Sequence, residues 1–189
     1  MSLRIYGNRP LKTLPGLATR PTPSRVRQAL FNIWQGNIEG CRWLDLCAGT
    51  GAMAAEALCR GAIDVVGIEE SGRACDIIQQ NWQQVAGSGQ KFQVIRGNVT
   101  AKLPSLAQRS QKFDRIYFDP PYAGNLYLPV LEAIDHHSLL AESGELAAEH
   151  SPDRALPERI GHLAIVRQKV YGSTALTFYS LQNLDSSPP

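Results

Sequence analysis

The sequence has no acidic residue before Glu39, although 17 acids occur among its 189 residues. The same segment carries six basic residues, namely Arg4, Arg9, Lys12, Arg20, Arg25 and Arg27. Because the formal net charge of the whole chain is only +2, a basic end precedes an acidic body. This asymmetry indicates that the end meets a polyanion, with solvated surface charge as the alternative interpretation.

Pairs of the C-x-x-C type are also absent. The four cysteines, Cys41, Cys47, Cys59 and Cys75, and the four histidines show no metal-ligand spacing, so we expect free buried thiols and no metal. No apolar run is long enough to cross a bilayer, and residues 1–9 lack the apolar stretch of a secretory signal. We therefore expect a monomeric cytoplasmic protein with no membrane partner.

The pattern from Arg42 onward is an alternation of short apolar strands with helices. It predicts an α/β fold with a mostly parallel seven-stranded sheet, whose last two strands form a C-terminal antiparallel hairpin. The expected strands are 43–47, 64–68, 92–95, 115–118, 145–149, 163–170 and 175–182, and the expected helices of this part are 52–60, 71–86 and 125–136.

Three regions follow from this pattern. Residues 1–40 are expected to be a basic N-terminal extension on the substrate side, comprising a short strand or irregular arm and a helix that begins near Ser24. Residues 41–184 form the predicted main domain. Residues 185–189 are expected to be a disordered tail.

A glycine-rich turn follows the first strand of the main domain. Residues 45–51 read Asp-Leu-Cys-Ala-Gly-Thr-Gly, and Glu69 ends the next strand, where an acid can bond ribose hydroxyls. Asn98 follows the third strand, where an amide can bond an adenine. The candidate cofactor-binding residues are Asp45, Cys47, Ala48, Gly49, Thr50, Gly51, Glu69, Asn98 and Val99.

Two cofactors fit the turn, because Gly49-x-Gly51-x-x-Ala54 also satisfies a loose dinucleotide pattern. The carboxylate of Asp45 would repel the pyrophosphate of NAD. It suits the amino-acid ammonium group of S-adenosylmethionine, which has no phosphate. The residues therefore favour S-adenosylmethionine over NAD, and a turn without any ligand is the remaining alternative.

A second motif, Asp119-Pro120-Pro121-Tyr122, follows the fourth strand. The carboxylate of Asp119 and the carbonyl of Pro120 can each accept one N–H of an exocyclic amine, which orients the nitrogen for methyl transfer. Tyr122 offers a ring on which an extruded or unpaired base can stack. These four residues are the candidate catalytic residues, and a rigid Pro-Pro turn is the structural alternative.

The chain resembles a known family at these motifs. The Asp45 turn, Glu69 and the D-P-P-Y loop look like those of class I, amino-directed methyltransferases. Residues 17–32, which read LATRPTPSRVRQALFN, closely resemble the signature of the RsmD-type 16S rRNA guanine-N2 methyltransferases. The resemblance extends over about residues 2–182.

The resemblance implies a Rossmann-like class I methyltransferase fold and a protein that makes N2-methylguanine in small-subunit rRNA, with S-adenosylmethionine as the cofactor. It implies that the basic extension lies near the RNA. The candidate RNA-binding residues are Arg4, Lys12, Arg20, Thr22, Arg25 and Arg27. The alternatives are N6-adenine or other amino methylation of DNA or RNA, and a non-catalytic RNA-binding assembly factor that has kept the fold.

Overall fold

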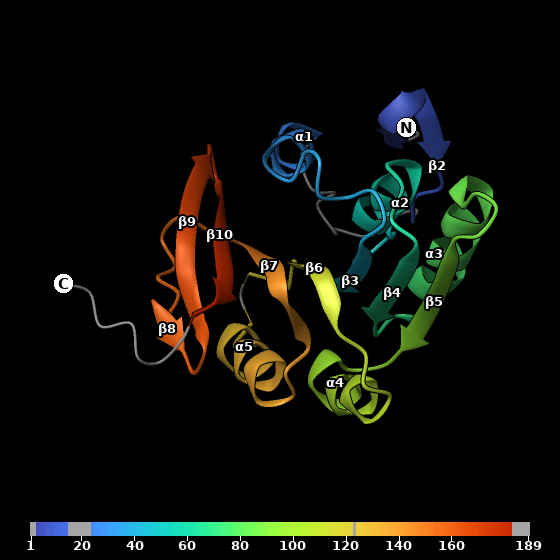
Figure 1. Ribbon diagram of the computed structural model, residues 1–189. Coiled ribbons are helices and arrows are strands. Elements are labelled where there is room, and N and C mark those ends of the chain that lie inside the picture. Colours follow the sequence, from blue (N-terminus) through green and yellow to red (C-terminus); the bar gives the residue numbers. More distant parts are fainter. Residues whose placement is uncertain (1–2, 15–23, 123, 183–189) are drawn as a thin grey trace.

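The computed structural model describes residues 3–14, 24–122 and 124–182, and a central sheet dominates it (Figure 1). The strands of the sheet are β3 (Arg42–Leu46), β4 (Asp64–Glu69), β5 (Lys91–Arg96), β6 (Phe113–Phe118), β7 (Leu140–His150), β8 (Arg159–Ile160), β9 (Leu163–Tyr171) and β10 (Thr174–Leu181). Within the described residues, eight strands lie in the order β5-β4-β3-β6-β7-β10-β9-β8. The strands from β5 to β7 are parallel, whereas β10, β9 and β8 pair antiparallel.

Helices cover both faces of the sheet, as Figure 1 shows. The helices of one face are α1 (Ser24–Ile33), α2 (Ala52–Cys59) and α3 (Gly72–Val85), and those of the other are α4 (Val99–Gln108) and α5 (Tyr127–His136). Each face has its own apolar cluster, so the central strand β3 is apolar on both sides. This three-layer arrangement is the Rossmann-like fold that the sequence predicts.

The N-terminal extension is a small hairpin, with β1 (Leu3–Ile5), a 3₁₀ turn η1 (Tyr6–Asn8) and β2 (Arg9–Leu11). Ile5 and Leu11 are buried in the same apolar cluster as α1 and α2. The extension and the main domain therefore share one core, although they are separate stretches of the sequence.

The structure corrects the sequence-based expectations in three places. Helix α4 occupies a stretch where no helix was expected, because Pro104 and the Gly97-Asn98 pair resemble loop signals. Strand β7 begins at Leu140 instead of Glu145. The two-residue strand β8 gives the sheet an eighth strand where seven were predicted.

Ordinary caps stabilise the ends of the helices. The hydroxyl of Ser71 accepts a hydrogen bond from the N–H of Ala74 at the start of α3. Gly61, with a φ of 97°, follows the end of α2, where a left-handed glycine commonly ends a helix. None of the helices in the described residues is long and apolar enough to cross a membrane.

Candidate active site at the carboxyl ends of the central strands

The predicted cofactor turn and the predicted catalytic loop lie at the same edge of the sheet. The N–H of Ala48 donates to the carbonyl of Ile68 over 3.2 Å, which ties the turn to the end of β4. The N–H of Asp119 donates to the carbonyl of Leu46 over 3.3 Å, which ties the loop to the end of β3. The strand order reverses at β3 and β6, and open α/β sheets bind their ligands at this point.

The two glycines of the turn are needed for different reasons. Both have positive φ, 56° at Gly49 and 71° at Gly51. A Cβ on Gly49 would meet nothing within 4 Å, whereas one on Gly51 would lie 2.6 Å from Nε1 of Trp82. Gly49 therefore borders open space in which a ligand can approach the backbone, and Gly51 allows the turn to pack on α3.

Glu69 connects the turn to the start of α3. Its Oε2 accepts from the N–H of Gly49 and its Oε1 from the N–H of Ser71, each over 2.9 Å. The structure thus brings Glu69 to the glycine turn from which it is separated by 20 residues. A ribose hydroxyl placed here would meet a carboxylate whose position is already fixed.

Asp45 lies beneath the turn and is only 1% exposed. Its Oδ2 accepts a hydrogen bond from the N–H of Ala54 over 3.1 Å, in the first turn of α2. Burial raises the pKa of this carboxyl well above its usual range, because the charged form has lost its hydration. Contact of Asp45 with an ammonium group stays a prediction.

Acidic groups gather around the thiol of Cys47. Burial, together with the negative charges of Glu69, Asp119 and Asp45, raises the pKa of this thiol to about 12. These carboxylates come from the ends of three different strands, and the uncharged thiol lies among them. Such a site suits a cationic cofactor and opposes the pyrophosphate of a dinucleotide.

The D-P-P-Y loop is fastened at its last residue. The hydroxyl of Tyr122 donates to Oε1 of Glu149 over 3.0 Å. The carbonyl of Tyr122 accepts from Nη2 of Arg154 over 2.8 Å. Glu149 and Arg154 were not among the predicted site residues, although Glu149 lies near the end of a strand that reaches this edge.

The loop exposes some of its members and hides others. Pro120 is buried, Pro121 is exposed, and Asp119 and Tyr122 are half-buried. Burial raises the pKa of the Tyr122 hydroxyl, so it stays a proton donor at neutral pH. The half-buried side chains are placed between the interior and any substrate at the strand ends.

Two further predicted cofactor residues occupy the start of α4. Asn98 is exposed and caps this helix, since its Oδ1 accepts from the N–H and the hydroxyl of Thr100. Val99 is buried in the apolar cluster of the α4–α5 face, so its side chain is part of the core. A role for these residues toward an adenine stays a prediction.

The predicted RNA-binding residues do not form one group. Arg4, Lys12 and Arg25 are exposed. Lys12 donates from Nζ to Oε1 of Gln80 over 2.6 Å, which places it beside α3. Arg20 and Thr22 lie outside the described residues.

Arg27 requires a correction. Its side chain is 4% exposed, and its Nε donates to Oε2 of Glu56 over 2.7 Å. Its Nη2 donates to the carbonyl of Arg4 over 2.7 Å. In this position Arg27 joins α1 to α2 and β1 inside the protein, so we no longer include it among the residues expected to contact RNA.

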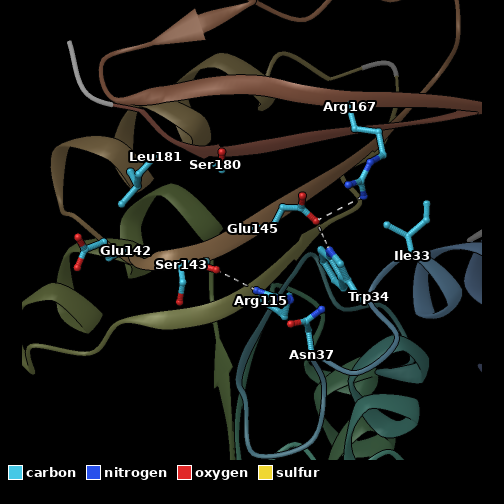
Figure 2. A pocket seen from close by; sticks show the side chains of 11 residues that line it. Ile33, Trp34, Asn37, Arg115, Glu142, Ser143, Glu145, Arg167, Ser180 and Leu181 are labelled. Atoms are coloured by element: carbon cyan, nitrogen blue, oxygen red, sulfur yellow. Dashed lines mark hydrogen bonds and ion pairs between the residues drawn. The ribbon is translucent and has the colours of Figure 1, made fainter. Parts of the chain in front are cut away.

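A polar pocket of about 280 Å³ lies elsewhere, between the end of α1 and the first residues of β7 (Figure 2). Trp34 donates from Nε1 to Glu145 there, and Arg167 forms an ion pair with the same carboxylate at 4.0 Å. Arg115, at the middle of β6, contributes its guanidinium. None of the residues predicted to be functional lines this pocket.

The strand order, the glycine turn and the antiparallel strands at one edge define the fold of the class I methyltransferases. The chain belongs to the family described as Conserved hypothetical protein 95, whose profile matches residues 3–180. This match and the relatives below confirm the family resemblance predicted from the sequence.

Two relatives match over nearly their whole length. YlbH of Bacillus subtilis, provisionally named an rRNA methyltransferase, is 33% identical over 171 residues, which are 90% of this chain and 92% of YlbH. Ribosomal RNA small subunit methyltransferase D of Escherichia coli is 28% identical over 94% of this chain and 89% of its own. The solved structure of yhhF from Escherichia coli, provisionally titled a methyltransferase, has a TM-score of 0.78 and 27% identity, covering 96% of this chain and 99% of that one.

Proposed function

We propose that the protein transfers a methyl group from S-adenosylmethionine to the exocyclic N2 amine of a guanine in small-subunit 16S rRNA, in the cytoplasm. The observation that carries the proposal is that hydrogen bonds bring the glycine turn above Asp45, the carboxylate of Glu69 and the start of the D-P-P-Y loop at Asp119 to one edge of the sheet. The relatives named as rRNA methyltransferases support the choice of rRNA.

The residues at the turn fit this cofactor. Gly49 borders open space, and Glu69 is held where a ribose would lie. The acidic surroundings match a ligand with a sulfonium and an ammonium group. When bound, the cofactor supplies an electrophilic methyl group on sulfur.

The catalytic loop would orient the nucleophile. The amine of a base is a weak nucleophile, because its lone pair is delocalised into the ring. By accepting its two N–H groups, the Asp119 carboxylate and the Pro120 carbonyl favour a localised lone pair that points toward the methyl group. The ring of Tyr122 would stack on the base.

The surface that faces the substrate would consist of exposed basic residues on the N-terminal extension and on α1. Arg4, Lys12 and Arg25 are candidates for contact with phosphates, and Arg20 and Thr22 remain candidates from the sequence. Such contacts hold the RNA without reading its sequence, so they would contribute a salt-dependent part of the affinity.

A labelling experiment tests the proposal. Purified protein, tritiated S-adenosylmethionine and rRNA or small-subunit particles from a strain lacking the enzyme are incubated, and the RNA is digested to nucleosides. We expect label in N2-methylguanosine. Label in N6-methyladenosine of RNA or of short DNA duplexes would replace the guanine assignment, and a protein that binds the cofactor but labels nothing would indicate a non-catalytic factor.

A further inference from the structure

Glu149 is a buried acid at the same edge of the sheet as the D-P-P-Y loop. It follows Ala148, which pairs with Phe118 in the register of β7 and β6, so it lies beside the start of the loop at Asp119. Glu149 is only 3% exposed. A carboxylate is costly to bury unless protein groups replace its hydration, so its partners explain why it is tolerated.

The carboxylate of Glu149 links the loop to the sheet. Oε1 accepts from the hydroxyl of Tyr122, 3.0 Å away, and Oε2 accepts from the hydroxyl of Tyr117 on β6. Tyr117 is 1% exposed and belongs to the core of the α1–α3 face. One oxygen therefore faces the rigid interior and the other holds the ring that ends the loop.

Tyr122 has a second attachment at its main chain. Arg154 donates to its carbonyl over 2.8 Å and packs over the ring of Tyr127, with the guanidinium carbon 4.8 Å from the ring centre. The hydroxyl of Tyr127 in turn donates to the carbonyl of Glu149 over 2.9 Å. With both its hydroxyl and its carbonyl fixed, Tyr122 has one preferred ring orientation.

We propose that Glu149 is a positioning residue for methyl transfer, which fixes the ring of Tyr122 in the orientation that stacks on the target base. The inference rests on the proposed function. A reacting nitrogen must lie within a fraction of an ångström of its attack position, and small misplacements cost large factors in rate. Glu149 would supply this precision through Tyr122 without touching the base.

The test compares Glu149→Gln, Tyr122→Phe and the double variant in single-turnover transfer of tritiated methyl to rRNA or small-subunit particles. Gln has nearly the same size but one acceptor oxygen, so the two tyrosine hydroxyls can no longer both be held as in the native protein. We expect each single variant to lose roughly tenfold in rate. The double variant should lose no more than either single one, because both changes break the same link.

The matched control is Glu145→Gln. Glu145 lies on the same strand, accepts from an aromatic donor, Trp34, and faces the pocket in Figure 2 instead of the loop. This variant should keep the native rate. Calorimetric titration with S-adenosylmethionine should give all variants the native affinity, because the turn at Gly49 is unchanged.

Different results would overturn the role of Glu149 and the proposed function. A native transfer rate in Glu149→Gln, or multiplied losses in the double variant, would overturn the role of Glu149 while leaving the proposed function standing. Should Glu149→Gln fail to fold, a native rate in Tyr122→Phe would overturn that role by itself. A native protein that labels no guanine N2 would overturn the proposed function and this inference with it.

Discussion

Nε of Arg27 and Oε2 of Glu56 lie 2.7 Å apart, and both side chains are almost entirely buried, at 4% and 3% exposure. Arg60 approaches the other oxygen of the same carboxylate at 2.8 Å. Glu56 therefore pairs with two guanidinium groups, one of which is almost entirely shielded from water. The pair holds the N-terminal extension and α1 against α2.

Removing Glu56 should destabilise the protein strongly. We expect Glu56→Ala to lower the free energy of unfolding by about 3–5 kcal/mol, since it leaves the charge of Arg27 buried without a counter-charge. Urea unfolding measures this loss. Arg42→Ala, which breaks the more exposed ion pair with Asp114 and keeps the bond from the Arg42 N–H to that carboxylate, should cost only about 1 kcal/mol. Equal losses in the two variants would contradict the view that burial sets the cost.

Alanine substitutions at the two glycines of the turn should have different effects, because Gly51 is needed for packing and Gly49 borders the space for a ligand. Gly51→Ala should cost about 2–5 kcal/mol of stability, because a left-handed residue is strained and its Cβ would overlap Trp82. Gly49→Ala should cost only about 1–2 kcal/mol, since strain is its sole penalty. Guanidinium unfolding gives both values.

Cofactor titration completes this comparison. Gly49→Ala should still fold but bind S-adenosylmethionine weakly, because its methyl group would occupy the space where the ligand approaches. Native affinity in a folded Gly49→Ala variant would show that the cofactor lies elsewhere.

Asp45→Asn should stabilise the protein without ligand and weaken its binding of the cofactor. Burial raises the pKa of Asp45 above the value it has in the unfolded chain, so its ionised form costs stability at neutral pH. Asn removes that charge and keeps an oxygen for the N–H of Ala54. We expect a higher melting temperature without ligand, and a roughly 10- to 100-fold weaker affinity for S-adenosylmethionine through loss of a charged partner.

The contrary results for Asp45 are also specific. A lower melting temperature would mean that the carboxylate stabilises the empty site. Unchanged affinity in calorimetry would remove Asp45 from the set of cofactor-binding residues.

Asp119→Ala should stop methyl transfer and leave cofactor binding nearly intact. Loss of an oriented acceptor for the amine should lower the rate by about 100- to 1000-fold. Single-turnover transfer and calorimetric titration measure the two properties separately. An equal loss of both would place Asp119 in the cofactor pocket instead of the base-binding loop.

Acid should weaken the fold through His150. Its Nδ1 lies 2.8 Å from the carbonyl of Ser151 and its Nε2 lies 2.7 Å from the hydroxyl of Thr177, which also accepts from Gln168. This arrangement fits a neutral ring that donates from Nδ1 and accepts at Nε2. Burial lowers the pKa of His150, and the charge of Arg154 also lowers it.

The direction of the pH dependence of stability follows from this lowered pKa. With a folded-state pKa below the unfolded value of 6.5, this contribution to stability is complete above pH 6.5 and declines as the pH falls below it. Urea midpoints across this range should show the decline, and His150→Gln should remove that component. A native pH profile in the variant would assign the acid sensitivity to other groups.

The sequence predicted which motifs meet at one edge of the sheet, because a local rule was sufficient. The glycine turn, Glu69 and the D-P-P-Y loop each follow a strand, and parallel strands end at one edge. The same rule would have pointed to Glu149, which precedes the end of β7, but its bonds to Tyr117 and Tyr122 depend on strand neighbours that the sequence does not reveal. Helix α4 was missed because its internal Pro104 is a loop signal by local propensity.

Arg27 shows how charge alone misleads. Arg27 was grouped with the exposed basic residues because it is an arginine. Leu30, Phe31 and Trp34, however, follow it at helical spacing and are buried. The residue thus belongs to the inward stripe of α1. Helical position, which the sequence does contain, was the better guide to its surroundings.

The amide of Asn81 has a consequence for truncation experiments. Its Oδ1 accepts from the N–H of Lys12, and its Nδ2 donates to the carbonyls of both Lys12 and Thr50. A shortened chain that begins after residue 12 would leave this buried amide without its two bonds to Lys12, next to the glycine turn. Deleting the extension would therefore disturb the glycine turn together with the proposed RNA contacts, and only point substitutions at the exposed basic residues can measure the two effects separately.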